Sequence, residues 1–251
     1  MLVETALEQE EGLRDVSKYR AVLQAVAGGR TTRNEIAQRA GLANDRALRD
    51  KLDRLVELGY VETRQNLDAG PTDAVRYGVA YAAFRFYERV VEPNRSVLEL
   101  YPAARVWAGS VAPHLDAYMG HEFERIAAET YVRRSDALGL PLVAEWGRWE
   151  GVDRERRPVE IDVVSRLAGG GVLTSKVKWD QSLAGPSVHA AHVDKLRRMA
   201  ASGRAWAHEA LAPGAPLLYV AAAGFTEGFR VAAEADGRAV TCWALGDLYG
   251  G

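Results

Sequence analysis

Two apolar segments in the second half of the chain each carry a pair of charged side chains. Glu160 and Asp162 lie in the run VEIDVVS, and Lys176 and Lys178 lie in the run VLTSKVKW. Residues two apart in an extended strand share one face. Carboxylates so arranged can bind Mg²⁺ or Mn²⁺, and a nearby lysine can orient or activate a water molecule. The lysine can instead pair directly with a carboxylate, which would make a salt bridge rather than a metal site.

The segments around these residues are predicted to alternate between helices and strands. A helix opening at Gly120 contains Glu124. The predicted strands are 142–149, 159–165, 172–179, 217–222 and 239–244. Further helices are expected at 189–202 and 226–235. This αβββαβαβ order predicts an α/β or α+β domain with a mixed sheet.

That order, with an aspartate on one strand and X-X-Lys on the next, resembles the PD-(D/E)XK restriction-endonuclease-like superfamily. In that superfamily two carboxylates hold the metal and the lysine positions the attacking water. The resemblance implies that Glu124 is the helix glutamate, Asp162 the strand aspartate and Lys178 the motif lysine. An active site of this kind would use Mg²⁺ or Mn²⁺.

Lys176 departs from the superfamily pattern, because it stands where a metal-binding glutamate is expected. A cation there removes a ligand and repels the metal, at a cost on the order of several kcal/mol at low effective dielectric. We therefore expect a degenerate, inactive site in which Lys176 pairs with Asp162 or Glu160. The alternative is an active site in which Glu160 joins Asp162 and Glu124 as a metal ligand.

A second resemblance covers nearly the whole chain. The stretches SKYRAVLQAVAGG, FRFYERVVEPNRS, GHEFER, EIDVV and VKW look like the C-terminal half of archaeal-type AAA ATPases of the DEXX-box class. Those proteins carry a P-loop ATPase domain, then a winged helix, then a nuclease-like domain of uncharacterised function. This sequence has no Gly-Lys dipeptide and hence no P-loop, so no ATP site is expected in it. The resemblance implies that the ATPase domain was lost, that it is a separate polypeptide with which the chain works, or that the chain is a fragment of a longer ATPase. A second copy of the chain is the other partner considered.

The first half of the chain predicts three short helices followed by a hairpin. Ser17 can cap the first helix, and Thr32 with Glu35 forms a capping box for the second. Asn44 is expected to cap a third helix over 45–58, whose inward face holds Leu48, Leu52, Leu55 and Val56. Two strands, at 60–64 and 75–79, are expected on either side of a Gly70-Pro71 turn.

This order resembles the winged helix-turn-helix family, in which the third helix lies in the DNA major groove. The resemblance implies DNA contacts by residues on that helix and near the wing, namely Arg46, Arg49, Lys51, Arg54 and Arg64. Residues 17–65 hold ten lysines and arginines against six acidic residues. Asp45, Asp50 and Asp53 interleave with the basic residues, so a protein-docking or purely structural role is the alternative.

An aromatic run at Tyr81–Val91 is expected to pack as a connector between two domains. We place an N-terminal winged helix-turn-helix domain at 1–95 and a restriction-endonuclease-like α/β domain at 96–251. The predicted function is DNA binding with a weakened nuclease-like domain associated with an ATPase. The alternatives are a Mg²⁺- or Mn²⁺-dependent deoxyribonuclease and an interaction module that does not touch DNA.

Composition bounds these interpretations. The chain has 251 residues, 48% of them hydrophobic, and a formal net charge of −2. Near-neutral charge excludes a globally basic nucleic-acid binder but leaves local patches open. Its single cysteine, Cys242, excludes a disulfide framework. The acidic start has no leader pattern and no run is long enough to span a membrane, so a cytoplasmic location is expected.

His189 and His192 have the spacing of helical metal ligands, but without an evident third ligand they are expected to pack or lie on the surface. Cys242 is expected to be buried and inert. Lys195, Arg197 and Arg198 form a basic cluster on a predicted helix, facing either DNA or solvent.

Overall fold

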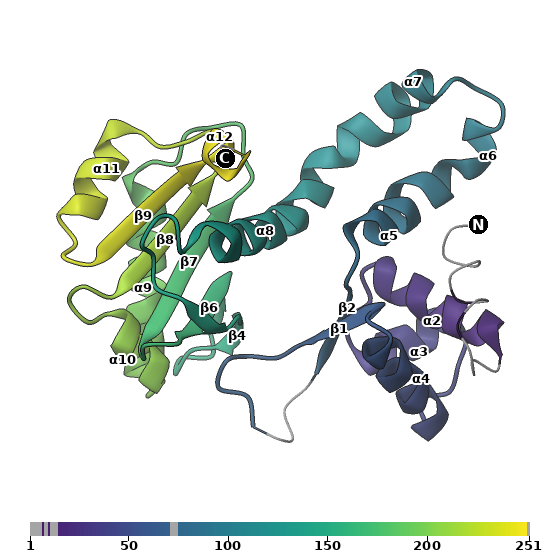
Figure 1. Ribbon diagram of the computed structural model, residues 1–251, viewed down its shortest axis with the longest axis horizontal. Helices are drawn as coiled ribbons and strands as arrows, with labels where there is room; N and C mark the ends of the chain where they lie inside the picture. The colour runs from purple at the N-terminus through teal and green to yellow at the C-terminus, as the bar shows by residue number, and fades with distance from the viewer. Residues whose placement is uncertain (1–6, 8–9, 11–14, 71–74, 250–251) are drawn as a thin grey trace. The chain divides into compact units, whose positions relative to one another are not determined.

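The computed structural model describes residue 7, residue 10, residues 15–70 and residues 75–249 (Figure 1). These residues form two compact units. Unit 1 comprises the described residues up to Gln65 together with Gly70–Pro113, and unit 2 comprises Asn66–Ala69 and the described residues from His114 onward. The sequence-based boundary at residue 95 lies inside unit 1. Pro71 and most of the acidic start, on which the turn and leader predictions rest, lie outside the described residues.

The N-terminal part of unit 1 contains three helices and a two-stranded antiparallel sheet. These elements are α2 (Val16–Ala27), α3 (Arg33–Ala40), α4 (Arg46–Glu57), β1 (Val61–Arg64) and β2 (Arg76–Val79). Their shared core includes Val22, Ile36, Leu48, Leu52 and Leu55. The three inward leucines predicted for the third helix are therefore buried, whereas Val56 is only partly buried.

Local capping sets the starts of two of these helices. The capping box of Thr32 and Glu35 is present, with Thr32 Oγ1 accepting from the Glu35 N–H and the Glu35 carboxylate accepting from the Thr32 N–H. The prediction that Asn44 caps the third helix is wrong. Asp45 is the cap, and its carboxylate accepts from the Leu48 N–H at 3.1 Å. Asn44 Oδ1 is bound instead by the guanidinium of Arg33 at 2.6 Å.

The rest of unit 1 is a chain of short helical segments. The α-helical parts are α5 (Ala82–Phe86), α6 (Arg95–Leu98) and α7 (Ala103–Val106). π-Helical turns at η1 (Tyr87–Val91) and η3 (Trp107–Val111) and 3-10 turns at η2 (Glu92–Asn94) and η4 (Ala112–His114) join them. Phe84 packs against the unit 1 core and stacks on Tyr60 with ring centroids 6.0 Å apart. The connector aromatic Phe84 therefore contributes to a core.

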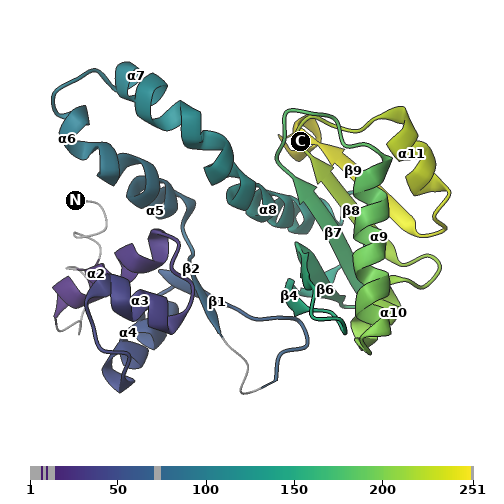
Figure 2. The ribbon, with the colours of Figure 1, turned by 180° about the vertical axis from the view of Figure 1, so that it is seen from behind.

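Unit 2 is built on a five-stranded mixed sheet in the order β3-β6-β7-β8-β9 (Figure 2). Its strands are β3 (Val143–Glu145), β6 (Val163–Leu167), β7 (Val172–Lys178), β8 (Pro216–Ala221) and β9 (Ala239–Ala244). The β3–β6 and β6–β7 pairs are antiparallel, and the β7–β8 and β8–β9 pairs are parallel. The predicted mixed sheet is therefore confirmed.

Helices cover both faces of this sheet. One face packs against α8 (Leu115–Arg134) and α12 (Leu245–Tyr249), through a core that includes Phe123, Tyr131 and Trp243. The other face is covered by α9 (Pro186–Ala201), α10 (Ala205–Ala210) and α11 (Glu227–Glu234). Figures 1 and 2 show these two layers from opposite sides. The α10 and α12 helices are not foreseen by the sequence pattern.

The predicted strand 159–165 is broken at Asp162. Its first part, β5 (Pro158–Ile161), pairs with β4 (Trp149–Val152) in a separate two-stranded sheet, and its second part is β6. The prediction that Glu160 and Asp162 share one face of a single strand is therefore wrong. Asp162 instead occupies the bend between the two sheets. The predicted strand 142–149 is likewise divided, between β3 and the start of β4.

The segment Asn66–Ala69 is part of unit 2, although β1 and β2 of unit 1 flank it in sequence. Asn66 bonds the backbone of Glu150 twice, donating to its carbonyl oxygen at 2.8 Å and accepting from its N–H at 2.9 Å. The Asp68 carboxylate accepts from the indole N–H groups of Trp149 at 3.0 Å and Trp206 at 3.2 Å, and from Arg204 at 2.9 Å. One carboxylate therefore satisfies two indoles and a guanidinium.

None of the helices in the described part of the chain has the length and apolar character needed to cross a bilayer.

Candidate functional site

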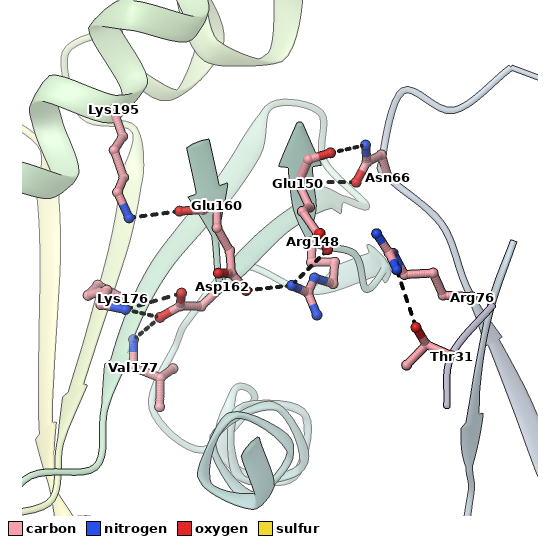
Figure 3. Close-up of polar contacts among 10 residues, drawn as sticks. All are labelled: Thr31, Asn66, Arg76, Arg148, Glu150, Glu160, Asp162, Lys176, Val177 and Lys195. Atoms are coloured by element: carbon pink, nitrogen blue, oxygen red, sulfur yellow. Dashed lines mark hydrogen bonds and ion pairs between the residues drawn. The ribbon is translucent and has the colours of Figure 1, made fainter. Parts of the chain in front are cut away.

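Asp162 and Lys176 form an ion pair at the point where the β6–β7 ladder ends. Val163 lies opposite Ser175 in that ladder, so Asp162 and Lys176 are the next residues in register. Lys176 Nζ donates to Asp162 Oδ2 at 2.8 Å and to Oδ1 at 3.2 Å (Figure 3). The Val177 N–H also donates to Asp162 Oδ2, at 2.8 Å. The Asp162 carboxylate is buried, and both of its oxygens are occupied.

Glu124 approaches this pair from α8, the longest helix of unit 2. Its carboxyl is half-buried on the same helix as Phe123, which packs in the core. Burial, and then the negative charge of Asp162, raise the pKa of Glu124 to about 7, while Arg148 and Lys176 oppose the shift. The structure thus brings Glu124 into electrostatic contact with Asp162.

Glu160 is directed to a different set of partners. Its carboxylate accepts from the Arg148 guanidinium at 2.5 Å, and its backbone carbonyl accepts from Lys195 Nζ at 2.9 Å (Figure 3). Arg148 also reaches the Glu150 carboxylate at 3.4 Å. Sequence reasoning missed the role of Arg148, because its closer partner, Glu160, lies on β5 and is brought to it only by the pairing of β4 with β5.

Lys178 shares the β7 face of Lys176 but faces other groups. Its ammonium pairs with Asp180 Oδ2 at 3.3 Å and donates to Ser182 Oγ at 3.4 Å. Hydrogen bonds from Ser182, together with this ion pair, hold the pKa of Asp180 at about 2. Of the four predicted catalytic residues, Glu124, Asp162 and Lys176 are therefore gathered, and Lys178 is engaged with the loop that follows β7.

These donors do not fit a divalent cation. Mg²⁺ and Mn²⁺ require several oxygen ligands with free lone pairs directed at one point. Both oxygens of Asp162 face the ammonium of Lys176, and Glu160 faces the guanidinium of Arg148. Within the described ranges no three His, Cys, Asp or Glu side chains are grouped so that they could hold a metal ion. The cation at this site is the protein's own lysine.

In unit 1 the five predicted DNA-contacting residues differ in the exposure of their side chains and in the partners that these side chains have within the protein. Arg46 and Arg49 on α4 have side chains 93% and 66% exposed, with Asp50 and Asp53 at 3.9 Å. Lys51 lies over the Tyr19 ring, 5.5 Å from its centroid. The remaining two pair closely with acidic neighbours, Arg54 with Glu57 at 2.7 Å and Arg64 with Glu62 at 2.8 Å.

The two helical histidines of α9 are buried. His189 Nδ1 lies 2.7 Å from the Tyr219 hydroxyl, and its Nε2 lies 3.1 Å from Asp236 Oδ2. His192 Nε2 lies 3.3 Å from Thr174 Oγ1, and burial lowers the pKa of His192 to about 3. Of the two places expected for these side chains, the interior and the surface, both occupy the interior. Cys242 is only half-buried, and burial raises the pKa of its thiol.

Comparison with known proteins gives few matches. A family model described as Archaea bacterial proteins of unknown function, DUF234, matches residues 87–193, a stretch that includes Glu124, Asp162 and Lys176. No curated protein matches the chain.

Two solved structures show distant similarity. Rv1404 from Mycobacterium tuberculosis is 15% identical over 56% of this chain and 84% of its own, with a TM-score of 0.25. The MspJI restriction endonuclease, solved with a 27-mer oligonucleotide, is 17% identical over 68% of this chain and 39% of its own, with a TM-score of 0.34. Neither similarity is close enough to define the fold of this chain.

Proposed function

We propose that the protein binds duplex DNA through helix α4 of unit 1. The observation that carries this proposal is the pair Arg46 and Arg49, which project from the N-terminal half of α4 with side chains 93% and 66% exposed. Exposed arginines can bond guanine edges and phosphates with two parallel N–H groups. Their acidic neighbours at 3.9 Å are too distant for strong hydrogen bonds, so the guanidinium donors are available to a ligand.

The fold of unit 1 supports this role because it fixes α4 firmly. Leu48, Leu52 and Leu55 are fully buried on the opposite side of the helix, and Asp45 caps its first turn. The three-helix order followed by a hairpin is the arrangement that places a third helix in the major groove in winged helix-turn-helix proteins. Lys51, Arg54 and Arg64, which already have partners in the protein, are assigned to phosphate contacts at the margin.

DNA binding is tested by fluorescence anisotropy with a labelled 30-base-pair duplex at several KCl concentrations. The double variant Arg46→Gln/Arg49→Gln is expected to weaken binding at least tenfold, since each specific base or phosphate contact contributes about 1–3 kcal/mol. Arg230→Gln on α11 is the matched control, because that arginine is exposed and lies on unit 2. If the wild-type chain fails to bind the duplex at low salt, an interaction module without DNA contact takes the place of this proposal.

We further propose that unit 2 is a nuclease-like domain without cleavage activity. The Lys176–Asp162 ion pair supports this second proposal, because the lysine ammonium is bonded to the carboxylate oxygens that a metal ion would need as ligands. The alternative is a Mg²⁺- or Mn²⁺-dependent deoxyribonuclease, which the convergence of Glu124 on Asp162 favours. In a plasmid-nicking assay with Mg²⁺ and Mn²⁺, the proposal expects no metal-dependent nicking above background. Nicking that disappears in Asp162→Ala would establish the nuclease instead.

The proposed partner is a separate ATPase, as the sequence resemblance to DEXX-box ATPases implies. Without a Gly-Lys dipeptide, the sequence offers no P-loop lysine to hold nucleotide phosphates. We therefore expect the chain itself to show no ATP binding by isothermal titration calorimetry. A second copy of this chain is the other partner considered. The molar mass of the purified chain, measured by light scattering, shows whether it forms a homodimer without an ATPase.

A further inference from the structure

The turn between β4 and β5 is organised around one buried carboxylate. Asp153 Oδ1 accepts from the backbone N–H groups of Glu155 and Arg157, each at 2.9 Å. Its Oδ2 accepts from the guanidinium groups of Arg157 at 2.8 Å and Arg198 at 2.7 Å. With four donors on one carboxylate that is only 2% exposed, the five-residue turn 153–157 is held in a single conformation.

The turn is also attached to helix α9. The Arg154 N–H donates to Ser202 Oγ at 2.8 Å, just beyond the helix end, and Arg198 Nη2 donates to the Pro158 carbonyl at 3.4 Å. These bonds fix both sides of the turn against the same helix. Side chains that point outward from it are therefore presented by a rigid support.

Two arginines project from this support without a carboxylate partner. Arg154 and Arg156 are exposed, and among the described residues neither takes part in an ion pair, whereas Arg157, the last residue of the turn, pairs with both Asp153 and Glu155. Arg156 also has a φ of 63°, in the left-handed region that glycine adopts most easily. An arginine at this position costs backbone energy and gives the fold no ion pair in return.

A third cation lies at the other end of β5. Lys195 Nζ donates to the backbone carbonyl of Glu160 at 2.9 Å, and within the described part of the chain it takes part in no ion pair, so no carboxylate neutralises its charge (Figure 3). The four residues of β5 extend about 13 Å at 3.3 Å per residue. The arginines of the turn and the Lys195 ammonium are thus separated along β5, so they would contact different phosphates of the DNA backbone.

We propose that Arg154, Arg156 and Lys195 form a phosphate-binding surface on unit 2 that contacts the backbone of duplex DNA. The guanidinium groups can each bond a phosphate with two N–H donors, and the ammonium adds a point charge. Because such a surface contacts phosphates and not base edges, it would increase the affinity for DNA without adding sequence preference. The inference rests on the proposed function, because it takes duplex DNA as the ligand, but its residues belong to unit 2 rather than to α4 of unit 1.

The test uses the full chain and the same labelled duplex, with Arg154→Gln, Arg156→Gly and the double variant. The slope of log K against log[KCl] is negative, and each lost phosphate contact is expected to reduce its magnitude by about 0.9, so the double variant reduces it by about 1.8. Arg156→Gly is the sharpest variant, because glycine relieves the left-handed backbone while it removes the charge. We expect its melting temperature to be unchanged or higher while its DNA affinity falls several-fold. Arg230→Gln again serves as the control.

The outcomes separate this inference from the proposed function. If the α4 double variant weakens binding and the turn variants leave both affinity and salt slope unchanged, the phosphate-binding surface is wrong and the proposed function stands. If Arg156→Gly binds less and also melts at a lower temperature, the arginine has a structural role and the inference is again overturned. If the turn variants weaken binding and the α4 variants do not, the inference stands and the α4 proposal fails.

Discussion

Lys176 stands directly opposite Asp162 where two antiparallel strands separate, and its ammonium bonds both carboxylate oxygens at 2.8 and 3.2 Å. The ammonium of Lys176 thus neutralises the buried Asp162 carboxylate and bonds both of its oxygens, so no ion from solution is needed. Because Glu124 lies close enough to be perturbed by the same carboxylate, the lysine also offsets the repulsion between the two acids.

Replacing the lysine by an acid is expected to create a metal site. In Lys176→Glu the new carboxylate would face Asp162 across the strands, close enough to Glu124 for the three acids to repel one another until a divalent cation bound. We expect Mn²⁺ at about a hundred times its Kd to raise the melting temperature of this variant by roughly 5–10 °C, and to leave the wild type unchanged. Lys178→Glu makes the same charge change two residues away and is expected to show no metal-dependent shift. An equal shift in the wild type would contradict the view that Lys176 occupies the site.

Removing the charge of Asp162 is expected to destabilise unit 2. Asp162→Asn loses the ion pair with Lys176, and hydrogen bonds to charged groups contribute about 1.5–3 kcal/mol. We therefore expect the free energy of unfolding in urea to fall by about 1–3 kcal/mol. Glu160→Gln, which removes a more exposed pair with Arg148, should cost only about 0–1 kcal/mol. The ranking is the test, and a larger loss for Glu160→Gln would refute it.

The buried histidine of α9 makes stability depend on pH. Burial lowers the pKa of His192 to about 3, well below the ordinary value near 6.5 that it has in the unfolded chain. Below pH 6.5 the unfolded state therefore binds a proton that the folded state does not, so stability falls as the pH decreases towards 3. Between pH 7.5 and 5 we expect the wild type to lose about 2 kcal/mol more than His192→Gln, at 1.36 kcal/mol per pH unit.

The control for this pH dependence is His208→Gln, because His208 is exposed on α10. Urea denaturation at closely spaced pH values should give that variant and the wild type the same slope. Parallel curves for the wild type and His192→Gln would show that His192 is not the group responsible.

The Asp68 carboxylate is expected to contribute strongly to the stability of unit 2. In Asp68→Ala the indole N–H groups of Trp149 and Trp206 lose their acceptor, and each unsatisfied buried donor costs about 1–3 kcal/mol. We expect a lower denaturation midpoint and a shift of tryptophan emission. Asp68→Asn retains one acceptor oxygen and should lie between the wild type and Asp68→Ala. If the alanine and asparagine variants unfold like the wild type, the carboxylate is not needed for packing the two indoles.

What the sequence predicts well is local. The capping box of Thr32 and Glu35 and the buried face of α4 follow from spacing within a few residues, and both are present. The choice of Asp45 over Asn44 as the cap could not be predicted, because both side chains can accept the same hydrogen bond. The bond from Arg33 that occupies Asn44 Oδ1 comes from a residue on another helix.

What the sequence could not predict depends on partners far along the chain. The run VEIDVVS is uniformly strand-like, but β5 pairs with β4 and β6 pairs with β7, so the backbone must bend at Asp162. That bend turns Asp162 toward Lys176 and leaves Glu160 with Arg148. Pairing of this kind is set by tertiary packing, and no pattern within the run encodes it.

Because Asn66–Ala69 belongs to unit 2, that unit is discontinuous in sequence. A fragment that begins at His114 would contain the whole mixed sheet but would lack Asp68, leaving two tryptophans and Arg204 without their common acceptor. Cutting the chain once between the units therefore cannot yield a complete second unit. A peptide covering residues 65–70, added in trans, is expected to supply the Asp68 carboxylate again and so to raise the stability of such a fragment.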